Sequence, residues 1–252
     1  EEKVDDHKLG LWQSLLRDAS NTNRDSSLRR STLLLCGDAE VGKRSLLKAM
    51  IGADDDTSNG GFGYKFYEYE DEKVHHVEAW WLSEKTHAGF LERACPSDTE
   101  GLLRTAFVIC LNLSEPEKIK SSLESWMSLI EKMVKKKIDS LEADAKDSIF
   151  ESCKKRLSEY DSKEQFECLG VPIVVVCTQS DSLVGGERLN IRKLSWLQWW
   201  LRQYCLSRGI ALICTWCSSV VFENFNHISH FNTHFVVRST RASTHNIPFT
   251  LI

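Results

Sequence analysis

The feature that most constrains the fold is a short apolar run that ends in a glycine-bearing turn and leads into a helical pattern. The run covers residues 32–36, and every residue after Thr32 is apolar, as is typical of a parallel strand buried on both faces. The turn that follows reads Gly-Asp-Ala-Glu-Val-Gly-Lys-Arg-Ser over residues 37–45, and residues 45–50 have a helical composition. This order predicts a βα unit whose loop can surround an anion at a helix N-terminus.

Further apolar runs extend this unit into an alternating α/β pattern. We predict a hairpin from strands at 64–69 and 74–82, and more strands at 106–113, 173–177 and 211–214. A helix begins near Pro116 and either continues or breaks and restarts through residues 138–157; another covers 189–208, with Gly209 as its stop. The alternation predicts a three-layer α/β fold with a mostly parallel sheet. We expect the fold to be incomplete at its C-terminal end, because no closing helix is recognisable there.

Net charge and cysteine usage limit the partners and the cellular compartment that we predict for the protein. The net charge of −4 and a pI near 6.1 support neither a nucleic acid partner nor an anionic membrane. No apolar run approaches the ~20 residues of a membrane span, so we expect no membrane insertion. Nine cysteines are scattered without a regular spacing, and Cys36, Cys110 and Cys177 lie in strand-like runs. This usage is typical of reduced thiols, so we predict a cytoplasmic protein.

The glycine turn matches a phosphate-binding loop (P-loop) in shape more than in chemistry. Lys43 stands where a P-loop lysine contacts phosphate, but Arg44 takes the place of the Ser or Thr that ligates Mg²⁺. Ser45 is displaced by one residue, which on a helix rotates its side chain by roughly 100°. Asp38 and Glu40 add negative charge where a phosphate would lie. We interpret the loop as degenerate and predict weak Mg-nucleotide binding.

The other parts of a nucleotidase are also incomplete. Ser83 stands where a carboxylate should hold Mg²⁺ at the end of the third strand. Of the guanine-reading Asn-Lys-x-Asp sequence only the last residue is kept, as Asp181 after Thr178. We predict no catalytic residue and no metal site, and the only cofactor we consider is a guanine or adenine nucleotide. Its candidate binding residues are Gly37, Gly42, Lys43, Arg44, Ser45, Thr178 and Asp181.

Two other patterns have competing interpretations. The spacing of Cys214, Cys217, His230 and His234 fits a zinc finger, but Cys214 ends a strand-like run, so coincidence is favoured. The tryptophans at 196, 199 and 200 could form an exposed partner-binding patch. In the alternative, which we favour, Trp196 and Trp200 pack in the core and Trp199 sits at its edge.

Several patches, in order along the chain, resemble the dynein light intermediate chains. The patches are LWQSLL at 11–16, WWL at 80–82, LGVPIVVVCT at 169–178 followed by Asp181, WLRQYCL at 200–206 and GIALI at 209–213. The family's Asp-Gly after the second patch is Ser83-Glu84 here, and no resemblance is recognisable after Thr215. The resemblance implies a Ras-like fold that binds the tail of the dynein heavy chain. The family's adaptor-binding arm is not carried over to these residues.

Taken together, the sequence predicts three regions and a non-catalytic role. The three regions are an N-terminal helix and linker at 1–31, a Ras-like P-loop domain at 32–217, and a divergent tail at 218–252. The resemblance implies an accessory subunit that binds the dynein heavy chain and other dynein subunits in the cytoplasm and on the microtubule cytoskeleton, and supports cargo transport. The alternative is a divergent small GTPase or ATPase that uses Lys43 and Asp181.

Overall fold

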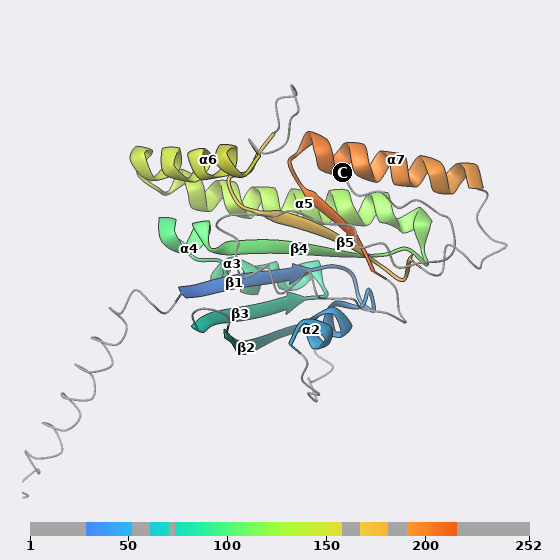
Figure 1. Cartoon of the computed structure of the whole chain (residues 1–252), viewed down its shortest axis with the longest axis horizontal. Helices are drawn as coiled ribbons and strands as arrows, with labels where there is room; N and C mark the ends of the chain where they lie inside the picture. Colours follow the sequence, from blue (N-terminus) through green and yellow to red (C-terminus); the bar gives the residue numbers. More distant parts are fainter. Residues whose placement is uncertain (1–28, 52–60, 71–73, 158–166, 181–190, 216–252) are drawn as a thin grey trace, which may run out of the picture.

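The computed structural model describes residues 29–51, 61–70, 74–157, 167–180 and 191–215. Six strands in these ranges form one sheet in the order β2-β3-β1-β4-β5-β6 (Figure 1). Only β2 is antiparallel to its neighbour; all other pairs are parallel. The strands are β1 (Arg29–Cys36), β2 (Phe62–Glu70), β3 (Val74–Leu82), β4 (Thr105–Asn112), β5 (Ile173–Thr178) and β6 (Ala211–Cys214).

Helices cover both faces of the sheet. One core contains Leu34 and Phe107 and packs beneath the helices that follow β3, β4 and β5; the other contains Leu33 and Leu35 and packs beneath the helix after β1. Figure 1 shows α5, α6 and α7 beside β4, β5 and β6, and α2 beside β2 and β3. The helices are α2 (Lys43–Ile51), η1 (Lys85–His87), α3 (Ala88–Ala94), α4 (Thr99–Leu103), α5 (Pro116–Asp139), α6 (Ala143–Leu157) and α7 (Ile191–Ser207).

The predicted three-layer fold with a mostly parallel sheet is confirmed, with adjusted boundaries. β1 begins at Arg29, inside the predicted linker, because its first residues pair with His75 and His76 of β3. The long helical pattern breaks at Ser140 and restarts as α6. Gly209 ends α7 with a φ of 62°, as predicted. η1, α3 and α4 were not predicted, because three to seven residues are too few to show helical periodicity.

The cysteines in the described ranges follow the prediction with one exception, and Cys217 lies outside these ranges. Cys36, Cys110 and Cys177 are buried and free. Cys153 and Cys168 form a disulfide that joins α6 to the segment before β5. The prediction of reduced thiols was therefore wrong for this pair, which no spacing pattern marks in the sequence.

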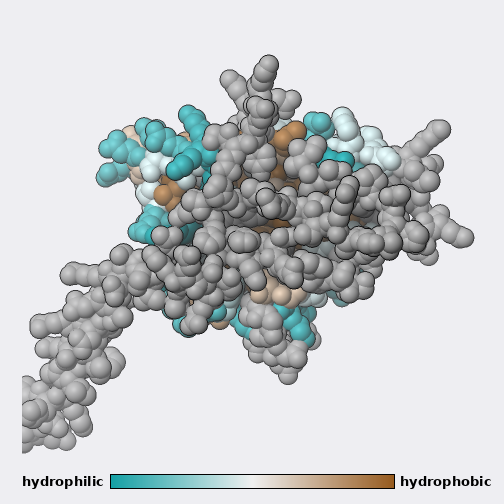
Figure 2. Space-filling view, viewed as in Figure 1, coloured by the Kyte–Doolittle hydropathy of each residue, from teal (hydrophilic) through white to brown (hydrophobic). Residues whose placement is uncertain are grey.

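The outer surface of α6 is largely polar. Figure 2 shows hydrophilic side chains over the end of the molecule that α6 occupies. Lys154 and Lys155 of α6 are exposed there, as charged side chains on a solvated helix face are. Within the described ranges, no helix has the length and apolarity that crossing a membrane requires.

Candidate nucleotide-binding site

The loop between β1 and α2 has the backbone of a tight glycine turn. Gly37 has a φ of 152°, and a Cβ placed on it would lie 2.6 Å from the carbonyl oxygen of Cys110 on β4. Glu40 and Gly42 also have positive φ values, of 60° and 84°. Glycine is needed at 37 because β4 passes too close for any side chain. The loop then enters α2, where the Leu46 amide donates to the Gly42 carbonyl at 2.9 Å.

Lys43 turns back into this loop. Its side chain is buried, with the residue only 4% exposed, and its Nζ donates to the carbonyl oxygens of Gly37 at 2.9 Å and Asp38 at 2.5 Å. Burial lowers the pKa of Lys43, and the charge of Asp38 opposes that shift. The ammonium that contacts phosphate in a nucleotide-binding P-loop is thus engaged by carbonyls of its own loop.

Asp38 makes contacts that the sequence analysis missed. We expected its carboxylate to face the phosphate position, but it accepts hydrogen bonds from two donors on α5. Ser122 Oγ lies 2.5 Å from Oδ2 and Trp126 Nε1 lies 3.0 Å from Oδ1. These donors are four residues apart on one face of α5, and no motif in the sequence links them to residue 38. Lys85 of η1 completes the group, with its Nζ 3.6 Å from Oδ1.

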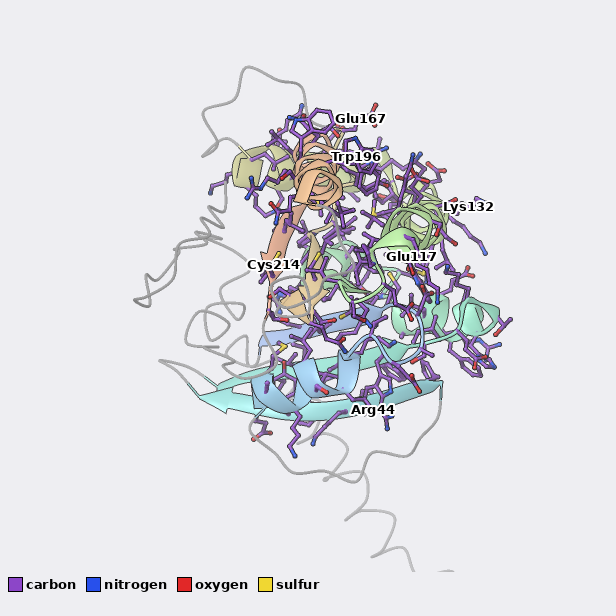
Figure 3. All side chains as sticks on the ribbon, turned by 90° about the vertical axis from the view of Figure 1, so that its right-hand side faces the viewer. Arg44, Glu117, Lys132, Glu167, Trp196 and Cys214 are labelled. Atoms are coloured by element: carbon purple, nitrogen blue, oxygen red, sulfur yellow. A yellow bond between two sulfur atoms is a disulfide. The ribbon has the colours of Figure 1, made fainter. Side chains whose placement is uncertain are left out.

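The expected Mg²⁺ ligands are replaced as the sequence indicates. Arg44 and Ser45 are both exposed on the first turn of α2, and Figure 3 shows Arg44 on this helix. Ser83 directly follows β3, and its amide donates to the Gly61 carbonyl at 2.7 Å. The next acid, Glu84, is exposed and pairs with His87 at 3.6 Å. In a GTPase this strand end carries the carboxylate that holds the metal, whereas here the position carries a hydroxyl.

Thr178, a predicted nucleotide-binding residue, contacts the loop through its hydroxyl. Its hydroxyl lies 2.9 Å from the carbonyl of Val41 and 3.1 Å from that of Leu111. It therefore fastens β5 to the loop and to β4, and it is buried. Asp181, the predicted base-reading acid, lies outside the described residues. Just before it, Ser180 bonds through its amide and its hydroxyl to the carbonyl of Thr215.

The structure brings together only part of the predicted site. Gly37, Gly42 and Lys43 meet Thr178 around one loop, whereas Arg44 and Ser45 face solvent.

The zinc alternative gains no support from the described part of the chain. Cys214 lies in β6, opposite Cys177 of β5, while the other three predicted ligands, Cys217, His230 and His234, lie outside the described residues. In the ranges that the structure describes, no group of three or more His, Cys, Asp or Glu side chains is placed to hold a metal ion.

Two aromatic surfaces lie away from the loop. On α7, Trp196 is 53% exposed and Trp199 58% exposed, whereas Trp200 packs partly against the core. The favoured prediction that Trp196 packs in the core was therefore wrong; it stacks on Trp200 with ring centroids 6.4 Å apart, outside the core. Figure 3 shows Trp196 and Arg44 at opposite sides of the molecule.

The second aromatic surface covers the sheet at its β2 edge. Phe62 and Tyr64 of β2 contact Trp80 of β3, and Phe62 stacks on Phe90 of α3 with centroids 4.8 Å apart. Tyr64 and Phe90 remain exposed. The sequence predicted the hairpin that carries most of this surface but not α3, which completes it.

The sheet order and the glycine loop define a Ras-like P-loop domain with altered metal-binding positions. The solved conserved domain of a dynein light intermediate chain has a similar fold, with a TM-score of 0.65 and 19% identity over 87% of this chain and 78% of that one. A family model, "Dynein light intermediate chain", matches residues 6–167 and 161–234. The chain therefore belongs to the dynein light intermediate chain family. The match continues past Thr215, where the sequence alone showed no resemblance.

Characterised relatives agree with this family. Cytoplasmic dynein 1 light intermediate chain 1 of Rattus norvegicus and of Homo sapiens are each 24% identical over 246 residues, covering 84% of this chain and 47% of the relative. The Gallus gallus protein is 23% identical over 254 residues. The chain thus spans about half the length of these relatives. Their names assign these relatives to cytoplasmic dynein 1.

Proposed function

We propose that this chain is a non-catalytic accessory subunit that docks on the dynein heavy chain and supports microtubule-based cargo transport. Membership of the light intermediate chain family supports a dynein accessory role. Other dynein subunits are further partners in this proposal.

The observation that carries the docking proposal is the pair of exposed indoles on α7. Trp196 and Trp199 together present two large aromatic side chains, each more than half exposed, on one helix. Tryptophan is enriched at interface hot spots because it buries a large area at a small cost in side-chain entropy. The surface lies far from the glycine loop, so docking there would not depend on nucleotide (Figure 3).

The loop chemistry favours a non-catalytic role over the GTPase alternative. Lys43 is held by the carbonyls of Gly37 and Asp38, and Ser83 replaces the metal-binding acid. A hydrolase would need Mg²⁺ at the transferred phosphate, and Ser83 lacks the carboxylate that would help to hold it. Any nucleotide bound through Gly42 and Thr178 would, in this proposal, be structural.

Docking is tested by measuring the affinity of the purified chain for a heavy-chain tail fragment. We expect the double variant Trp196→Ala/Trp199→Ala to bind at least about tenfold more weakly, as truncation of hot-spot aromatics does. The matched control is Tyr64→Ala/Phe90→Ala, which removes two exposed aromatics from the other surface.

Each result has a distinct meaning. Loss of binding in the α7 variant alone supports docking through α7. Loss in the control variant alone would move the contact to the β2 edge and overturn the assignment to α7. Absence of binding by the unmodified chain would overturn the docking proposal itself.

A further inference from the structure

The carboxylate of Asp38 joins three segments that are far apart in the sequence. It belongs to the glycine loop, its donors Ser122 and Trp126 belong to α5, and Lys85 belongs to η1. Lys85 also lies over the Trp126 ring, with Nζ 5.1 Å from the centroid. Loop, η1 and α5 therefore meet at one negatively charged group.

The segment after β3, which contains η1, has a known role in Ras-like GTPases. η1 follows β3, and in a GTPase the segment after this strand is a switch that is ordered when the terminal phosphate and Mg²⁺ of the nucleotide hold it against the loop. A GTPase with bound nucleotide and this chain share one feature: an anion at the loop is contacted by groups from the segment after β3. Here the anion is a side chain of the loop itself, and the cation of the switch segment is Lys85.

We infer that the Asp38 carboxylate, although it faces α5 and not the phosphate position, takes over the tethering role that the nucleotide phosphate has in a GTPase, and that it locks η1 against the loop and α5 in a fixed arrangement. The lock needs no ligand, because both carboxylate oxygens and the Lys85 ammonium are supplied by the chain. The segment after β3 would then not switch, and the domain would present one constant surface. This inference does not depend on which partner the domain docks on.

The energetic basis of the lock is the strength of charge-assisted hydrogen bonds in a partly buried site. Burial acts to raise the pKa of Asp38, but the hydrogen bonds from Ser122 and Trp126 and the charge of Lys85 outweigh it and hold the pKa below its usual range. The ionised carboxylate is thus the form that the fold selects. Its neutralisation should release η1 before it disturbs the sheet, because η1 is three residues long and none of them is buried.

Hydrogen exchange of the η1 amides tests the lock directly. The reporters are the amide of His87, which donates to the Glu84 carbonyl, and that of Ala88, which donates to the Lys85 carbonyl. In Asp38→Asn we expect both to exchange about tenfold faster, while amides of β4 keep their rates, as expected when hydrogen bonds to a charged group are weakened. Glu40→Gln is the matched control, since it removes the same charge from an exposed position in the same loop.

A second variant keeps the test decisive if Asp38→Asn does not fold. Lys85→Met leaves the bonds to α5 in place but removes the cation, so it should speed η1 exchange as well. If neither variant exchanges faster than Glu40→Gln, the lock is disproved. Addition of Mg-GTP or Mg-GDP to the unmodified chain should leave η1 exchange unchanged. Slower exchange with either would show that a nucleotide, and not Asp38, fixes this segment.

Discussion

The hydroxyl of Thr178 lies 2.9 Å from the carbonyl oxygen of Val41, across 137 residues of sequence. A residue expected to contact a nucleotide thus ties the end of β5 to the glycine loop. The hydroxyl carries one hydrogen, so it donates to Val41 or to Leu111 but not to both at once. Three sets of side-chain hydrogen bonds hold the loop. Thr178 bonds to the Val41 carbonyl, Lys43 bonds to carbonyls of its own loop, and two side chains of α5 bond to Asp38.

Replacing Thr178 with valine should destabilise the fold although valine is the more apolar residue. The change leaves buried carbonyls of Val41 and Leu111 without this donor, at a cost of about 1–3 kcal/mol in the free energy of unfolding. Thr178→Ser keeps the hydroxyl and is the control. Urea unfolding monitored by tryptophan fluorescence would measure both; a valine variant as stable as the serine variant would contradict a role for the hydroxyl.

Gly63 should not tolerate alanine, because the ring of its cross-strand partner covers it. A Cβ at Gly63 would lie 2.0 Å from Cζ2 of Trp81. We expect Gly63→Ala to cost about 1–3 kcal/mol, as other overpacking substitutions do. Gly89→Ala is the control: nothing lies within 4 Å of its Cβ, and in the helical position it should be neutral or stabilise by up to about 1 kcal/mol. Equal melting temperatures for the two variants would refute this packing.

The fold could be predicted from the sequence because its signals are local. The buried strands β1, β4 and β5 are continuous apolar runs, and the hairpin of β2 and β3 alternates. Gly37 and Gly209 mark a turn and a helix end by the conformations that only glycine adopts easily. The start of β1 was predicted three residues too late. It depends on pairing with β3, and the sequence of β1 alone does not show how far that pairing extends.

The loop chemistry was only half predictable. The replacement at Arg44 can be read from spacing alone, because P-loop positions are fixed in sequence. The replacement at Ser83 can be read from its place directly after the predicted strand at 74–82. The partners of Asp38 cannot, because Ser122 and Trp126 reach the loop through the packing of α5 on the sheet. The exposure of Trp196 was mispredicted for the same reason: spacing gives the face of a helix, but not how far the core extends beneath it.

The contribution of Asp38 to stability should disappear at acid pH. Its pKa is lower in the folded chain than its ordinary value of 3.8, so the unfolded state binds the proton first as pH falls. The stabilisation is complete well above pH 3.8 and is lost as pH drops through the folded pKa. The stability difference between the unmodified chain and Asp38→Asn should therefore be constant at neutral pH and shrink below pH 3.8. A difference that persists unchanged in acid would exclude an ionised Asp38 as its source.

Purified protein should carry no stoichiometric nucleotide, because the groups that would hold one are engaged elsewhere or replaced. Lys43 donates to its own loop, Arg44 cannot ligate Mg²⁺, and the position at Ser83 has no carboxylate. Denaturing the protein and separating the supernatant by ion exchange would reveal any bound guanine or adenine nucleotide. We also expect an unchanged melting temperature with Mg-GTP or Mg-ATP, since a ligand at 100 times its Kd would add about 2.7 kcal/mol of stability. Release of near-stoichiometric GDP or GTP would instead mean that Lys43 leaves its carbonyls for a phosphate, and the GTPase alternative would then be preferred.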